Sequence, residues 1–113
     1  QIFFVAGNHD WYTWGIQGLK QERKFIEEYL GRENVWLPKP GCGDPVEVEL
    51  NKDLVLVLLD SEWYLADWDG HTEINSGCEV KSRTMFQLAF DEVIKSNRNK
   101  NIVVAMHHPP YTY

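Results

Sequence analysis

The sequence of this 113-residue chain lacks two features that would each have indicated a class of partner. No apolar run approaches the eighteen or so residues that a membrane-spanning helix needs. There is also no excess of basic residues: the formal net charge is −6, and acidic residues are spread along the chain. A protein that binds a nucleic-acid backbone normally has a basic face, so we expect no such partner. If the substrate is anionic, bound cations must supply the positive field.

Cysteine is scarce, and its two occurrences leave two interpretations open. Cys42 and Cys78 both lie next to glycine in loop-like sequence, which fits either a disulfide or two unrelated buried thiols. A zinc site is not expected, because one pair at this separation matches no zinc-ligand spacing. The disulfide interpretation favours an extracytoplasmic location for the parent protein, either periplasmic or secreted.

Little sequence lies outside the core-like segments. Gln1 stands one residue before an apolar segment, and Tyr113 follows another by only a few residues. We therefore expect both ends to be truncated, with residues 1–113 forming the central part of one larger domain. The hydrophobic content of 43% suits a folded domain. The missing signal peptide then carries no information about the compartment.

Two amphipathic helices are predicted from hydrophobic periodicity. The first covers residues 16–30, and Gly31 is suited to end it. The second begins at Ser82, whose hydroxyl can cap a helix that runs to about Ser96.

Four segments have the patterns of strands. They are residues 2–6, 46–50, 54–59 and 102–106. The first, third and fourth are continuously apolar, which predicts strands buried on both faces, whereas 46–50 alternates strictly. The pair 46–50 and 54–59 predicts an antiparallel hairpin at the side of a sheet. Segment 34–44 is predicted to be a loop, and 62–81 a lid or specificity loop. The expected fold class is mixed α/β.

Two of these predicted strands end in residues capable of metal or proton chemistry. Gly7-Asn8-His9-Asp10 follows the first, and His107-His108 follows the last. Parallel neighbouring strands would bring both groups to one edge of the sheet, where α/β proteins place ligands. Amide oxygen and imidazole suit divalent Zn, Mn or Fe. Each residue alone also fits an ordinary cap or loop, but their coincidence at two strand ends favours a site.

These two blocks, in their strand context, resemble the calcineurin-like metallophosphoesterases, which include the purple acid phosphatases. Gly7-Asn8-His9-Asp10 is similar to the third block of that family and Met106-His107-His108-Pro109 to the fourth. The resemblance spans Ile2 to Pro110, and Leu59-Asp60-Ser61 and Gln87-Leu88 also look like the family's middle segment. It implies part of a four-layer α/β/β/α sandwich. The family's Asp-x-His, Gly-Asp and Gly-His-x-His blocks are missing, which truncation explains.

The resemblance also implies a role for each residue of the two blocks. Asn8, through its amide oxygen, and His107 would bind the second of two metal ions, which are Fe, Mn or Zn. His9 would not be a ligand; it would contact the phosphoryl oxygens and protonate the leaving group. Asp10 would orient His9.

Three further residues are candidate substrate contacts. His108 matches a variable position of the family pattern, and Trp11 and Tyr12 belong to an aromatic loop expected over residues 11–15. The same aromatic residues also fit a hydrophobic plug under the next helix, which is the interpretation we favour because aromatic side chains are mostly structural.

The predicted function is metal-dependent hydrolysis of phosphomonoesters or phosphodiesters. The substrate would be a small phosphate ester or a phosphoprotein, and two ions about 3.5–4 Å apart would clamp its phosphoryl group. Without the missing blocks, residues 1–113 alone are expected to be inactive. One alternative is a non-catalytic member of the family that binds a partner. Another, a self-contained binding domain with surface histidines, requires Gln1 and Tyr113 to be true termini.

Overall fold

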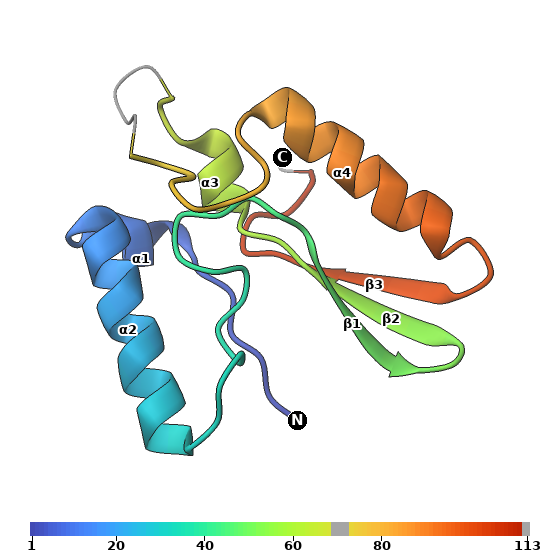
Figure 1. Ribbon diagram of the computed structural model, residues 1–113, viewed down its shortest axis with the longest axis horizontal. Coiled ribbons are helices and arrows are strands. Elements are labelled where there is room, and N and C mark those ends of the chain that lie inside the picture. Colours follow the sequence, from blue (N-terminus) through green and yellow to red (C-terminus); the bar gives the residue numbers. More distant parts are fainter. Residues whose placement is uncertain (69–72, 112–113) are drawn as a thin grey trace.

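The structure is a computed structural model that describes residues 1–68 and 73–111 (Figure 1). Its elements are α1 (Asn8–Tyr12), α2 (Gly15–Leu30), β1 (Val46–Asn51), β2 (Leu54–Leu58), α3 (Ser61–Leu65), α4 (Arg83–Ser96) and β3 (Asn101–Ala105). Residues 69–72, which belong to the predicted 62–81 loop, lie outside the described residues. The helices α1 and α2 lie on one side of the molecule, the sheet and α4 on the other, and α3 between them.

The three strands form one mixed sheet in the order β1-β2-β3. β1 pairs antiparallel with β2, so that Val46 lies opposite Leu58, and β2 pairs parallel with β3, so that Leu58 lies beside Ala105. The parallel pair requires a long crossover, which α3, α4 and their loops provide. The predicted mixed α/β class and the hairpin at the side of the sheet are therefore confirmed.

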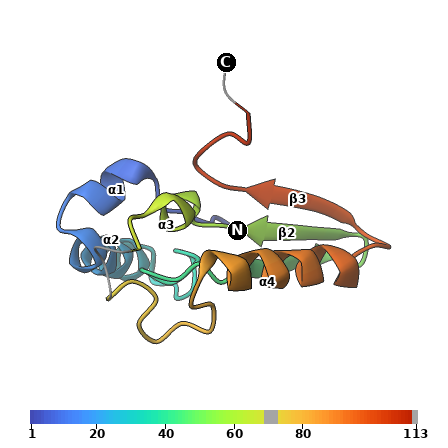
Figure 2. The same ribbon diagram turned by 90° about the horizontal axis from the view of Figure 1, so that it is seen from above.

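One face of the sheet packs against α4, which runs along it (Figure 2). Val57 and Leu59 on the sheet are buried against Val93 of α4, with Phe90 and Ile102 completing this cluster. Burying a side chain such as Val57 fully contributes roughly 1.5–3 kcal/mol. The helix therefore fixes the position of β2 and of the chain that leaves it.

Two predicted strands differ from the structure. Residues 2–6 do not form a regular strand: they pair only through one parallel bridge between Phe4 and Trp36, and the side chain of Ile2 is 49% exposed. The predicted last strand exists as β3, but it is not buried on both faces, and Val103 is 50% exposed. Among the described residues, β3 pairs only with β2 and is covered only by α4. The apolar composition of β3 predicted burial on both faces, but β2 and α4 do not cover both of its faces.

Short helices replace two segments that were predicted to be loops. Asn8–Tyr12 forms α1, and the carboxylate of Asp10 accepts a hydrogen bond of 2.6 Å from the backbone N–H of Gly7, which stabilises the first turn. Ser61–Leu65 forms α3, where Asp60 accepts from the N–H of Trp63 at 3.0 Å. Both helices are a little over one turn long, too short for a hydrophobic period to reveal.

The structure confirms the two predicted amphipathic helices and decides between the two interpretations of the cysteines. Gly31 ends α2 in a left-handed conformation with φ of 63°, and the hydroxyl of Ser82 caps α4 by accepting from Met85 N–H. Cys42 and Cys78 form a disulfide, so the interpretation as two unrelated thiols is wrong.

Glu27 attaches α2 to the segment that follows it. Its carboxylate accepts from Arg23 at 3.1 Å and from the backbone N–H groups of Val35 and Trp36. Burial by itself would raise the pKa of Glu27, but these hydrogen bonds outweigh it and hold the pKa below its usual value. The ionised carboxylate is therefore favoured by folding, and its contribution is lost as the pH falls.

Replacing this carboxylate with a neutral amide tests the attachment. Glu27→Gln should lower the free energy of unfolding at pH 7 by about 1 kcal/mol, because charged hydrogen bonds become neutral ones. The difference from the parent protein should shrink at pH 4, and urea denaturation at both pH values measures it. Glu28→Gln is the matched control, since Glu28 is exposed and forms a long ion pair with Lys24 at 3.9 Å. Equal losses from the two variants would contradict this role of Glu27.

Candidate metal centre

The parallel pairing of β2 and β3 brings their carboxyl ends to one place. The backbone N–H of Leu59, just after β2, donates to the carbonyl of Ala105 at 3.0 Å. Beyond this bond, β2 leads into Asp60 and Ser61, and β3 leads into the two histidines. The start of α1 lies beside them. The predicted site residues Asn8, His107 and His108 therefore lie at the carboxyl edge of the sheet. The predicted cause was wrong: β2, and not residues 2–6, is the parallel neighbour of β3.

Asn8 and His107, the two predicted metal ligands, are in direct contact. The Nε2 atom of His107 lies 3.0 Å from Oδ1 of Asn8. Gly7 permits this approach, because a Cβ at that position would lie 3.0 Å from Cε1 and Nδ1 of the His107 ring. Gly7 has an ordinary φ of −107°. Glycine is therefore needed here for space and not for its backbone freedom.

Tyr12 directs the amide of Asn8. The Nδ2 atom of Asn8 donates to the hydroxyl of Tyr12, one turn further along α1, at 3.4 Å. With the amide nitrogen held there, the amide oxygen faces His107. Tyr12 was predicted to be either a substrate contact or, as we favoured, part of a hydrophobic plug. The plug interpretation is wrong for Tyr12, which is 68% exposed, and its contact with the candidate ligand adds a positioning role.

The donor pair fits a divalent ion. The donor atoms of Asn8 and His107 lie 3.0 Å apart, close enough that both would hold the same ion. An amide oxygen and an imidazole nitrogen also suit borderline metals. Ligation requires Nε2 of His107 to be free of its proton, so a proton and a metal compete for this atom.

Within residues 1–68 and 73–111, the one cluster of three His, Cys, Asp or Glu side chains that could hold a metal ion comprises Cys42, Asp44 and Cys78, and both of its sulfurs are in the disulfide. These sulfurs cannot bind a metal as thiolates.

His9 and Asp10 occupy different environments. The His9 ring is exposed and packs at 5.6 Å from the ring of Tyr12. Asp10 bonds to Gly7 N–H and to the carboxyl of Glu22 on α2. Burial, together with the charge of Asp10 and the hydrogen bond to it, raises the pKa of Glu22. Asp10 therefore fixes α1 against α2, and its predicted action on His9 remains a prediction.

His108 is held by two residues that the sequence analysis did not assign to the site. Ser61 Oγ accepts from the backbone N–H of His108 at 3.1 Å and lies 2.8 Å from its Nδ1. The Nε2 atom of His108 is 3.6 Å from the carboxylate of Glu62. In the neutral ring, the Ser61 hydroxyl can donate to Nδ1, which leaves the proton on Nε2 facing Glu62. Ser61 and Glu62 stand directly after β2, the strand that runs parallel to β3. This position is the sequence signal that could have assigned them to the site.

Trp11 behaves as the structural plug that we favoured. Its indole N–H donates to the carboxylate of Asp60 at 2.9 Å, and its ring packs between the clusters around Leu19 and Trp63. Asp60 is only 4% exposed. Burial raises the pKa of Asp60 to about 6, although the hydrogen bonds from Trp63 and Trp11 oppose this.

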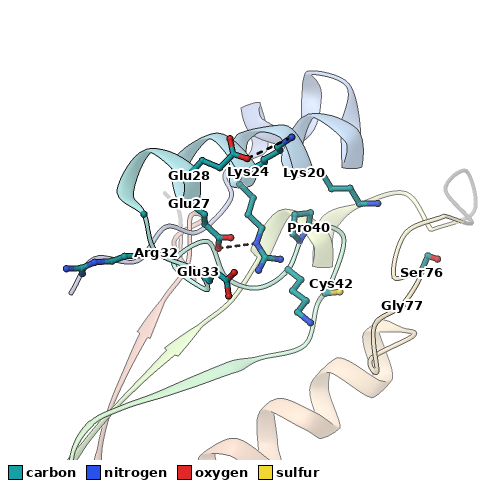
Figure 3. Close-up of a pocket in the computed structure, with 13 residues that line it drawn as sticks. Lys20, Lys24, Glu27, Glu28, Arg32, Glu33, Pro40, Cys42, Ser76 and Gly77 are labelled. Atoms are coloured by element: carbon teal, nitrogen blue, oxygen red, sulfur yellow. Dashed lines mark hydrogen bonds and ion pairs between the residues drawn. The ribbon is translucent and has the colours of Figure 1, made fainter.

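Cavities in the described part of the chain differ in their relation to the candidate site. One of about 580 Å³ is lined by Trp11, Tyr12 and Glu62, among others, and so adjoins the candidate metal centre. Another, of about 680 Å³, lies along α2 and is lined mainly by charged side chains, with the Arg23–Glu27 pair on its wall (Figure 3). None of the predicted site residues lines this second cavity.

A family model described as calcineurin-like phosphoesterase matches residues 1–113, the whole chain. The chain belongs to the calcineurin-like phosphoesterase family. This family hydrolyses phosphoester bonds and depends on metal ions. Comparison with curated proteins and with solved structures finds no match. In the described part of this phosphoesterase domain, no helix is both long and apolar enough to cross a bilayer.

The approach of His107 to Gly7 can be tested by substitution. Gly7→Ala should displace the imidazole by a few tenths of an ångström, weakening its contact with Asn8 and shifting the His107 ring resonances in NMR spectra. The free energy of unfolding should fall by about 1 kcal/mol. The added methyl group crowds the His107 ring, and this cost exceeds the stability gained because alanine restricts the unfolded chain more than glycine does. Gly31→Ala is the control: it strains a residue with positive φ and has open space around it. Unchanged His107 resonances in Gly7→Ala would refute the contact.

Proposed function

We propose that this calcineurin-like phosphoesterase hydrolyses phosphomonoesters or phosphodiesters at a two-metal centre beside the carboxyl ends of β2 and β3. The observation that carries the proposal is the contact of 3.0 Å between the donor atoms of Asn8 and His107. These residues come from opposite ends of the chain, and each was assigned as a metal ligand from its own block. The substrate is a small phosphate ester or a phosphoprotein.

Asn8 and His107 would hold one ion of the pair, which is Fe, Mn or Zn. Bound metal supplies positive charge for the phosphoryl group and a water that is nucleophilic at neutral pH. This charge explains how a chain with a net charge of −6 handles an anionic substrate. Tyr12 keeps the Asn8 oxygen directed at the site through its bond to the amide nitrogen.

His9 is suited to the second half of the reaction. The water oxygen forms a bond to phosphorus as the bond between phosphorus and the ester oxygen breaks, and the departing alcohol oxygen takes a proton. His9 lies next to Asn8 in α1, and its ring is open to solvent, so it can reach a leaving group and donate that proton. Asp10 holds the turn of α1 that carries His9 by bonding to Gly7 N–H.

Removing either donor tests the proposal in the full-length protein. Asn8→Ala and His107→Ala should each lower kcat/KM for a phosphoester by at least about 100-fold. Losing a residue that only hydrogen-bonds to a metal ligand already costs up to about 100-fold, and losing the ligand itself should cost no less. Both should also lower the amount of bound metal, as measured by elemental analysis. Asn99→Ala, at an exposed asparagine after α4, is the control. Wild-type protein that binds a partner but turns over no phosphoester would favour the non-catalytic alternative.

We also propose that the protein acts outside the cytoplasm. The Cys42–Cys78 disulfide supports this, because such bonds persist mainly in oxidising compartments. Thiol labelling of the native, full-length protein should find neither cysteine reactive without a reductant. Labelling of both would contradict the proposal.

A further inference from the structure

The cavity of about 580 Å³ shares two residues with the surroundings of the candidate metal centre. Tyr12 lines the cavity and bonds to the amide of Asn8, and Glu62 lines it and faces His108. The volume falls within the range of about 300–1,000 Å³ that is usual for small-molecule pockets. A substrate held at Asn8 and His107 can therefore extend into this space.

Much of the cavity wall is apolar and exposed to solvent. Tyr12, Trp14 and Leu65, which we call the apolar wall, are 68%, 82% and 60% exposed. They come from α1, from the residue before α2 and from α3. Large apolar side chains gathered in a hollow, which no part of residues 1–68 and 73–111 covers, are typical of a surface that binds a ligand.

Neither packing nor backbone preference explains the tryptophan at position 14. It has φ of 66° and ψ of 12°, a left-handed conformation that is unfavourable for a bulky side chain. It is also the N-cap of α2 but makes no side-chain capping bond. Asparagine or glycine would suit both roles better. A strained, exposed tryptophan beside a candidate site indicates that its ring is used for binding.

We propose that this cavity binds the leaving group of the substrate, and that this leaving group is an alcohol bearing an aromatic ring that stacks on Trp14. The inference rests on the proposed phosphoesterase function and names the class of ester. Tyr12 sets the geometry, since its hydroxyl touches Asn8 while its ring forms part of the apolar wall. An ester with its phosphoryl group at the metal centre then places its alcohol against Trp14 and Leu65.

Two alkyl esters separate ring binding from chemical reactivity. In 2-(2-naphthyl)ethyl phosphate and ethyl phosphate the leaving alcohols have similar basicity, so the ratio of their kcat/KM values reports the ring. The metal-loaded, full-length protein should prefer the naphthyl ester by at least about 10-fold, as expected from aromatic stacking together with buried apolar area.

Substitution of Trp14 should remove this preference. Trp14→Gly suits the left-handed backbone, so the fold is retained, and the ratio of the two kcat/KM values should fall about 10-fold. Trp14→Phe should keep most of the preference. Tyr29→Ala is the control, because Tyr29 is 81% exposed near the end of α2 and does not line the cavity. Calorimetric binding of 2-(2-naphthyl)ethanol, which needs no turnover, should weaken in parallel.

The outcomes distinguish this inference from the proposed function. Equal kcat/KM values for both esters, unchanged in Trp14→Gly, would overturn the inference and leave the phosphoesterase function intact. If the protein hydrolyses neither these monoesters nor any phosphodiester, the proposed function fails, and the naphthylethanol measurement decides whether the cavity binds aromatic alcohols. Binding to phosphatidylcholine vesicles that depends on Trp14, with no binding of naphthylethanol, would assign the apolar wall to a membrane surface and overturn the inference.

Discussion

The candidate site depends on the parallel pairing of β2 with β3. Because Leu58 pairs with Ala105, both strands end at the same edge of the sheet. His107 then meets Asn8, which reaches this edge from the other end of the sequence. The pairing is held by α4, whose Val93 buries the apolar face of the two strands. An antiparallel β3 would deliver its histidines to the opposite edge, away from Asn8.

Asp60 connects this edge to the rest of the molecule. It follows β2, caps α3 through Trp63 N–H and accepts the indole N–H of Trp11 on α1. Its pKa of about 6 lies above the ordinary value of 3.8, so the folded protein binds a proton more tightly than the unfolded chain does. The stability that protonation of Asp60 contributes is therefore fully present below pH 3.8 and is lost as the pH rises through 6. The same carboxylate that joins α1 to α3 thus costs stability once it is ionised.

Sequence patterns were sufficient for the long elements: periodicity located α2 and α4, and the hairpin was recognised from two neighbouring strand patterns. The resemblance to the family assigned Asn8 and His107 as metal ligands; the structure shows that they are in contact, and metal binding stays a prediction. The burial of β3 was harder to predict, because the apolar residues of a strand do not show which other elements pack against it. The roles of Ser61 and Glu62 arise only from tertiary contact with His108, since neither lies in a periodic pattern. The left-handed Trp14 was equally hidden, because nothing in a tryptophan's neighbours signals a positive φ.

Anomalous diffraction from crystals of the full-length protein, recorded at the absorption edge of its bound metal, tests the central claim most directly. We expect an anomalous peak about 2.0–2.2 Å from both Oδ1 of Asn8 and Nε2 of His107, with the hydrogen bond between these atoms replaced by two metal bonds. A metal-loaded crystal in which the ion binds elsewhere, while His107 still bonds to Asn8, would contradict the account.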